Sequence, residues 1–134
     1  VNRVVDKAER FGIASARAIE SWRRLVGDAA SLGSKVVLWG ASSKAVGFLS
    51  AIATNDAVTA AVDINPFKQD KFLPGSGHPV IGPGALTEIK PDLVIVMNPI
   101  YVPEIAETLS GQGLNPEIRA LGVEGARRPS EVAG

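Results

Sequence analysis

The feature that most constrains the fold of this chain is an alternation between short apolar runs and segments with helical periodicity. Short runs without a polar face are typical of strands buried on both sides of a parallel sheet. The expected strands are residues 35–39, 58–64, 80–81, 92–97 and 118–121. The expected helices between them are residues 43–53, 83–89 and 102–109.

Strands that alternate with helices form a parallel sheet with helices on both faces, joined by right-handed crossovers. We therefore expect an α/β fold, a Rossmann-like three-layer domain whose mostly parallel sheet has the strand order 3-2-1-4-5. The sequence has 134 residues, which suffice for one such domain with a single core. We place this domain at residues 34–122 and expect a flexible tail at residues 123–134.

The first 33 residues have a different pattern, in which apolar side chains recur at steps of three and four. This spacing predicts a long amphipathic helix over residues 1–33, which Gly33 ends and which links into the domain. The expected apolar stripe is Val1, Val4, Ala8, Phe11, Ala18, Trp22, Leu25, Ala29 and Leu32. Two interpretations stay open: the helix packs on its own domain, or it forms a connection to a preceding domain or a seam between copies.

Composition narrows the function classes. The 14 Lys and Arg residues balance 14 Asp and Glu residues, so the chain has no excess of positive charge that would attract a polyanion. We therefore expect neither nucleic acid nor a membrane as a partner. The sequence has no cysteine and one histidine, so disulfides, thiolate catalysis and a cysteine-ligated zinc are excluded. No apolar run approaches the roughly 20 residues of a membrane span. We expect a cytoplasmic protein and, because the chain starts at Val1, a piece of a longer one.

Ligands of open α/β sheets bind beyond the carboxyl ends of the strands, where the strand order reverses. The segment after the first strand, residues 40–44, resembles a degraded G-x-G-x-x-G turn in which Ser42 replaces the middle glycine. Gly40 makes the tight turn, while the N–H groups at the helix start, the hydroxyls of Ser42 and Ser43 and the charge of Lys44 favour an anion. The alternative is a structural turn with a serine cap and a solvated lysine.

Two further segments follow strand ends. Asp63 is placed like the carboxylate that binds a ribose in dinucleotide-binding folds, or it caps the turn that contains Asn65. Asn98 and Tyr101 follow the strongest strand, where an amide and a phenol suit recognition of a base, sugar or phosphate edge. The alternative for Asn98 is a turn cap.

His78, the one histidine of the chain, lies in the long loop 66–79, and loops of this length are often functional. It is either a structural residue or a member of the site, and no partner that would orient it as a base is evident. We therefore predict no catalytic residue. The acidic side chains of the helix at residues 102–109, Glu104 included, are interpreted as solvated surface charges.

Three segments together resemble a known family. VVLWGASSKAVGFL, VDINPFKQDKFLPGSGHPV and PDLVIVMNPIY are similar, in order and spacing, to the C-terminal domain of sugar C-methyltransferases. These are S-adenosylmethionine-dependent enzymes that act on nucleotide-linked deoxysugars. The resemblance covers roughly residues 35–121. The family turn usually reads G-A-G-S-K-G, and here Ser42 and Ala45 stand in place of two glycines.

The resemblance implies a substrate-side domain that holds a nucleotide-sugar and is inactive alone. It implies that S-adenosylmethionine and zinc belong to separate central and N-terminal domains, with the central methyltransferase domain as the partner and no cofactor or metal in this domain. The candidate substrate-binding residues are Gly40, Ser42, Ser43, Lys44, Asp63, Asn65, His78, Asn98 and Tyr101. The alternatives are an NAD(P)- or nucleotide-binding module, and a ligand-free interaction domain that forms a homo-oligomer through the N-terminal helix.

Overall fold

A computed structural model gives the fold and describes residues 16–52 and 55–122. The first half of the predicted N-terminal helix and the predicted tail lie outside these residues. Within the described ranges, none of the helices has both the length and the apolar character that a bilayer crossing requires.

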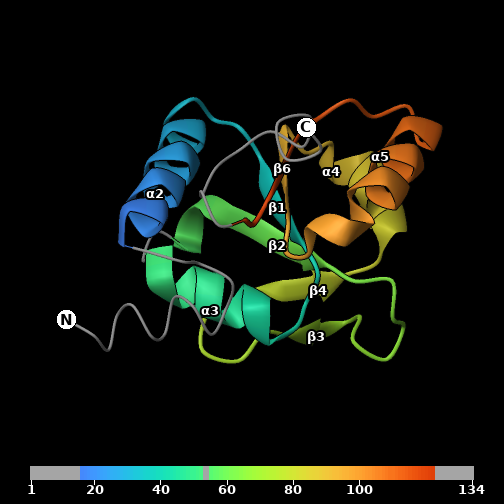
Figure 1. Cartoon of the computed structure of the whole chain (residues 1–134). Helices are drawn as coiled ribbons and strands as arrows, with labels where there is room; N and C mark the ends of the chain where they lie inside the picture. Colours follow the sequence, from blue (N-terminus) through green and yellow to red (C-terminus); the bar gives the residue numbers. More distant parts are fainter. Residues whose placement is uncertain (1–15, 53–54, 123–134) are drawn as a thin grey trace.

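A six-stranded sheet with the order β3-β4-β2-β1-β5-β6 forms the centre of the domain (Figure 1). All neighbouring strands are parallel except β3 and β4, which pair antiparallel at one edge. The strands are β1 (Val36–Trp39), β2 (Val58–Val62), β3 (Lys71–Phe72), β4 (Pro79–Ile81), β5 (Leu93–Val96) and β6 (Glu117–Ala120).

The observed order differs from the predicted one because the structure adds β3. The five predicted strands keep their relative order as β4-β2-β1-β5-β6, and β3 extends the sheet beyond β4. β3 lies inside the segment predicted as a loop, where the N–H of Asp70 donates to the Val80 carbonyl (2.9 Å) and the N–H of Leu73 donates to the His78 carbonyl (2.8 Å). Its two residues, Lys71 and Phe72, are both exposed, so no apolar run indicates this strand.

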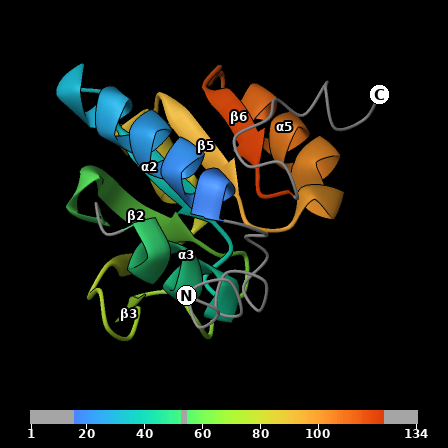
Figure 2. The ribbon, with the colours of Figure 1, turned by 60° about the vertical axis from the view of Figure 1, so that its left-hand side comes forward.

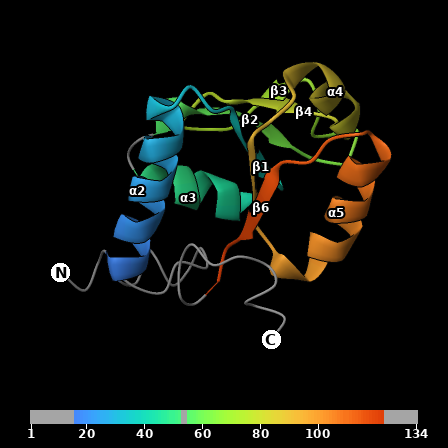
Figure 3. The ribbon, with the colours of Figure 1, turned by 90° about the horizontal axis from the view of Figure 1, so that it is seen from above.

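Helices cover both faces of the sheet, as the predicted three-layer arrangement requires. α2 and α3 lie on one face, whereas α4 and α5 lie on the other (Figures 2 and 3). The helices are α2 (Ala16–Ser31), α3 (Ser43–Ile52), α4 (Leu86–Ile89) and α5 (Val102–Gly111). The described residues also form three 3-10 turns: η1 (Asn55–Ala57), η2 (Pro83–Ala85) and η3 (Pro99–Tyr101).

The face under α2 and α3 is closed by large apolar side chains. Trp22 and Phe48 are fully buried and meet edge to face, with ring centroids 5.6 Å apart. Arg23 ties the two helices together, because its Nε donates to the Ile52 carbonyl (2.8 Å) and its Nη2 to the Ala51 carbonyl (3.2 Å). The described part of the predicted N-terminal helix therefore packs on its own domain.

The buried stripe of α2 agrees with the prediction in part, because Ala18 and Trp22 are buried and Leu25 and Ala29 pack partly buried against the same core. Ile19 and Val26, which the predicted stripe omits, are buried, whereas Leu32 is 83% exposed. Leu32 follows the last residue of α2, so it has left the helical repeat that the spacing assumed.

The apolar core on the opposite face of the sheet is smaller. Side chains of β1 and β5 that point away from α2 pack there against Leu86, Ile105 and Leu109.

Candidate functional site

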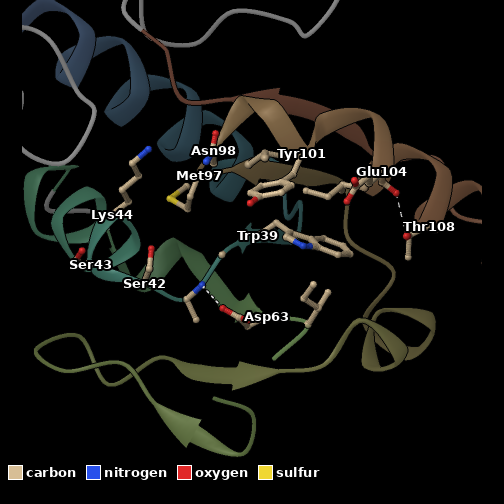
Figure 4. Close-up of a pocket in the computed structure, with 15 residues that line it drawn as sticks. Trp39, Ser42, Ser43, Lys44, Asp63, Met97, Asn98, Tyr101, Glu104 and Thr108 are labelled. Atoms are coloured by element: carbon tan, nitrogen blue, oxygen red, sulfur yellow. Dashed lines mark hydrogen bonds between the residues drawn. The ribbon is translucent and has the colours of Figure 1, made fainter. Parts of the chain in front are cut away.

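A cavity of about 510 Å³ lies at the carboxyl ends of β1, β2 and β5, between the start of α3 and α5 (Figure 4). The strand order reverses at β1, which pairs with β2 on one side and with β5 on the other, and ligands of open α/β sheets bind at such a reversal. The cavity is lined by Trp39, Gly40, Ala41, Ser42, Ser43, Lys44, Asp63, Ile64, Val96, Met97, Asn98, Tyr101, Glu104, Ile105 and Thr108.

Gly40 forms the tight turn predicted after the first strand. Its φ angle is +116°, and a Cβ atom placed on it would lie 3.2 Å from the Cβ of Met97. Its N–H donates to the Val62 carbonyl at 2.7 Å, so the backbone continues to follow β2 for one residue beyond β1. Both the backbone angle and the close approach of β5 require glycine here.

The start of α3 presents hydrogen-bond donors to the cavity. The Ser42 carbonyl accepts the first helical bonds, from the N–H groups of Ala45 (3.0 Å) and Val46 (3.3 Å). The N–H groups of Ser43 and Lys44 precede these bonds and have no acceptor within the described part of the chain. Their side chains and that of Ser42 line the cavity. A helix start of this kind attracts anions, because its N–H groups and its dipole both present positive charge.

Asp63 connects the end of β2 to the turn after β1. Its Oδ2 accepts the N–H of Ala41 at 3.0 Å, and its Oδ1 accepts the N–H of Asn65 at 2.9 Å. Both carboxylate oxygens are thus engaged by backbone, and the capping interpretation of Asp63 describes its contacts. The side chain still lines the cavity, where it fixes the position of the wall formed by Ala41.

Asn98 and Tyr101 form the wall that follows β5. Asn98 caps η3, because its Oδ1 accepts the N–H of Ile100 at 3.2 Å. Its amide nitrogen makes no hydrogen bond within residues 16–52 and 55–122. The Tyr101 ring stands at the cavity and is 51% exposed, at the point where η3 passes into α5 (Figure 4).

Two predicted site residues do not line the cavity. Asn65 is exposed and closes its own turn, since its Oδ1 accepts the N–H of Phe67 at 3.0 Å. His78 is buried and precedes β4, at the amino end of that parallel strand, whereas the cavity lies at the carboxyl ends. The structure therefore separates His78 from the other candidates.

Sequence reasoning missed three residues of the cavity that carry chemistry. Trp39 is the last residue of an apolar strand, so its sequence context indicates a core residue. It is 8% exposed, and it lines the cavity. Glu104 and Thr108 lie on α5; Glu104 is exposed, as interpreted, but it also lines the cavity. The signal was available, because positions 101, 104 and 108 share one face of a helix at steps of three and four.

The charges of the cavity are separated, with Lys44 at one end and Glu104 near the other (Figure 4). Within the described residues, no group of three or more His, Cys, Asp or Glu side chains could hold a metal ion. The arrangement can bind an elongated ligand with an anionic end, and its apolar middle favours a ring.

One family model matches residues 4–113, and its description is the C-methyltransferase C-terminal domain. The match includes every residue that lines the cavity. A search of curated proteins finds no match for the chain.

Proposed function

We propose, from the premise that this chain belongs to the family of C-methyltransferase C-terminal domains, that it binds the nucleotide-linked sugar of an S-adenosylmethionine-dependent enzyme. The observation that carries the proposal is the cavity at the carboxyl ends of the strands, on which the three family-like segments converge. Its volume of about 510 Å³ lies within the range of roughly 300–1,000 Å³ that small-molecule pockets occupy.

The start of α3 suits the diphosphate of such a ligand. Ser42, Ser43 and Lys44 line one end of the cavity, and the N–H groups of Ser43 and Lys44 have no acceptor among the described residues. Ser42 replaces a glycine of the family turn, so its hydroxyl supplies a donor where the backbone would otherwise approach the phosphate. Tyr101 and the Asn98 amide face the next part of the ligand.

The domain acts by binding and orientation. Methyl transfer needs S-adenosylmethionine, which supplies the methyl group, and we assign that cofactor and the catalytic base to a central domain of the same native chain. By holding the nucleotide, this domain would fix the sugar carbon before the methyl group, which lowers the entropic part of the barrier. The isolated chain is expected to be inactive.

The dinucleotide alternative has less support. A ribose would need the Asp63 carboxylate, and both oxygens of that carboxylate already accept backbone N–H groups of the cavity's own turns. We therefore expect NAD to bind more weakly than a sugar nucleotide.

The test is a titration of the chain with a nucleoside diphosphate sugar and with NAD, followed by amide NMR shifts. We expect shifts in residues 40–44 and 98–101 with the sugar nucleotide. Replacing Tyr101 with Ala should weaken binding by about 1–3 kcal/mol while the domain stays folded, because this half-exposed ring contributes one contact to the ligand and little to the core.

Phe67→Ala is the matched control, since Phe67 is 81% exposed and does not line the cavity. The Phe67→Ala variant should bind the sugar nucleotide with the affinity of the unchanged chain. Shifts with NAD alone would favour the dinucleotide alternative, and unchanged affinity in Tyr101→Ala would move the site away from this cavity.

A further inference from the structure

The two ends of the cavity differ in the hydrogen bonds that they can make, and this difference bears on which nucleotide fits. The end at α3 offers donors, from Lys44 and the free N–H groups at the helix start. The wall formed by α5 carries Glu104 and Thr108, on the other side of Trp39 and Tyr101 (Figure 4). The inference that follows rests on the proposed function.

Among residues 16–52 and 55–122, no hydrogen bond or ion pair competes for the Glu104 carboxylate. An ionised carboxylate accepts hydrogen bonds and donates none. The ion pairs among the described residues involve Glu20 and Glu117, and Glu104 takes part in none of them. Its place in the first turn of α5 suits the helix dipole. Glu107, the next carboxylate of the same helix, does not line the cavity and so provides a comparison.

Thr108 is also restricted to accepting. Its hydroxyl donates to the backbone carbonyl of Glu104 at 3.0 Å, which commits its one hydrogen. The remaining lone pairs of Oγ1 are what this side chain offers the cavity. Both polar side chains of α5 at the cavity therefore favour a ligand that brings N–H or O–H donors.

The surface between the two ends is apolar and partly aromatic, formed by Trp39, Val96, Met97, Tyr101 and Ile105. Aromatic walls of this kind favour flat rings, which they contact over a large area. A nucleobase satisfies this requirement, and its polar edge would then face the acceptors of α5.

We propose that Glu104 is a specificity-determining residue that selects nucleobases with two adjacent N–H donors, the pattern of guanine. The N1–H and the 2-amino group of guanine point the same way and match the two oxygens of one carboxylate, as charge-assisted hydrogen bonds. Thymine and uracil offer one N–H between two carbonyl oxygens, which a carboxylate repels. Selection arises from this mismatch as much as from the match.

The test measures the dissociation constants of GDP and dTDP by calorimetry for the unchanged chain, Glu104→Gln and Glu107→Gln. We expect GDP to bind at least tenfold more tightly than dTDP. In Glu104→Gln the affinity for GDP should fall at least tenfold, because the new amide presents N–H groups to the guanine donors, while the affinity for dTDP should rise, because the amide no longer repels the carbonyl oxygens of thymine. Glu107→Gln should bind both nucleotides like the unchanged chain.

Equal affinities, tighter binding of dTDP, or an equal loss of both nucleotides in Glu104→Gln would overturn the role of Glu104 and leave nucleotide binding standing. Failure of the unchanged chain to bind either nucleotide would overturn the role of Glu104 and the proposed function together. Binding of dTDP also reports that Glu104→Gln is folded.

Discussion

The two faces of the sheet are covered by helices in different ways. On the face under α2 and α3, Trp22, Phe48 and Ile52 are fully buried and fill the space between helix and strand. On the face under α5, the side chains of Trp39 and Ile105 belong to the core and also form the wall of the cavity. Ala41 and Met97 of the first core also reach the cavity, but the side chains between helix and strand on that face contribute to stability alone. The core under α5 contributes to stability and to binding.

Substitutions on the two faces should therefore have different effects on stability and on binding. A change deep in the first face should lower the free energy of unfolding without altering which ligand binds. A change at the turns around the cavity should alter both quantities, because the same backbone holds the strands together and shapes the binding surface. Three substitutions test the distinction, in order of decreasing expected effect.

Trp22→Ala should have the largest effect, a loss of about 3–5 kcal/mol in the free energy of unfolding. Trp22 is fully buried and packs edge to face on Phe48, so its removal leaves a cavity between α2 and α3. Urea denaturation followed by circular dichroism measures the loss. Leu32→Ala is the control and should change stability by less than about 0.5 kcal/mol, since Leu32 is 83% exposed. A comparable loss in both variants would contradict the described packing of α2.

Gly40→Ala should cost about 1–3 kcal/mol, because the φ angle of +116° strains any residue with a side chain. The added methyl group would also press on the Cβ of Met97, 3.2 Å away, and so displace the cavity wall. We expect weaker nucleotide binding together with the lower stability, measured by titration and urea denaturation. Gly111→Ala, where a Cβ meets nothing within 4 Å, should be neutral or slightly stabilising. Full affinity in Gly40→Ala would separate the turn from the site.

Asp63→Asn should have the smallest effect, about 1 kcal/mol. Asparagine keeps one acceptor oxygen, so one of the two backbone bonds, to Ala41 or to Asn65, is lost. Faster hydrogen exchange at the Ala41 or Asn65 amide, read by NMR, identifies which bond breaks. The exposed Asp28 provides the control, and Asp28→Asn should leave both amides unchanged. Unchanged exchange at both amides in Asp63→Asn would show that the carboxylate does not hold the turn.

The central strands could be predicted because burial on both faces leaves uninterrupted apolar runs, as in β1 and β5. β3 could not be, since its two residues are exposed and are joined to β4 by hydrogen bonds that no periodicity reveals. The apolar stripe of α2 was predicted in part, since Ala18 and Trp22 are buried as expected. The stripe was extended to Leu32, which lies beyond the helix, and it missed Ile19 and Val26.

The turns of the site could be predicted because parallel strands bring their carboxyl ends to one edge, which places Gly40, Asp63 and Asn98 together. The spacing of positions 101, 104 and 108 places them on one helix face, but it does not say that this face meets the cavity, because Ile105 and Leu109 set the rotation of α5 by packing on the sheet. The path of the long loop could not be predicted either. Nothing in the sequence says that the chain turns away from the cavity after Asp63 and carries His78 to the amino end of β4.

The antiparallel strand β3 also determines how the sheet ends. Without it, the open edge would be β4, whose unpaired N–H and carbonyl groups are a template for a strand of another molecule. With it, the outermost strand has two residues, carries the charge of Lys71 and follows Asp70, whose φ of +62° breaks the extended backbone. An edge strand this short offers few backbone N–H and carbonyl groups with which a strand of another molecule could pair. We therefore expect the domain to resist edge-to-edge aggregation on this side, even at the high protein concentrations that NMR titrations require.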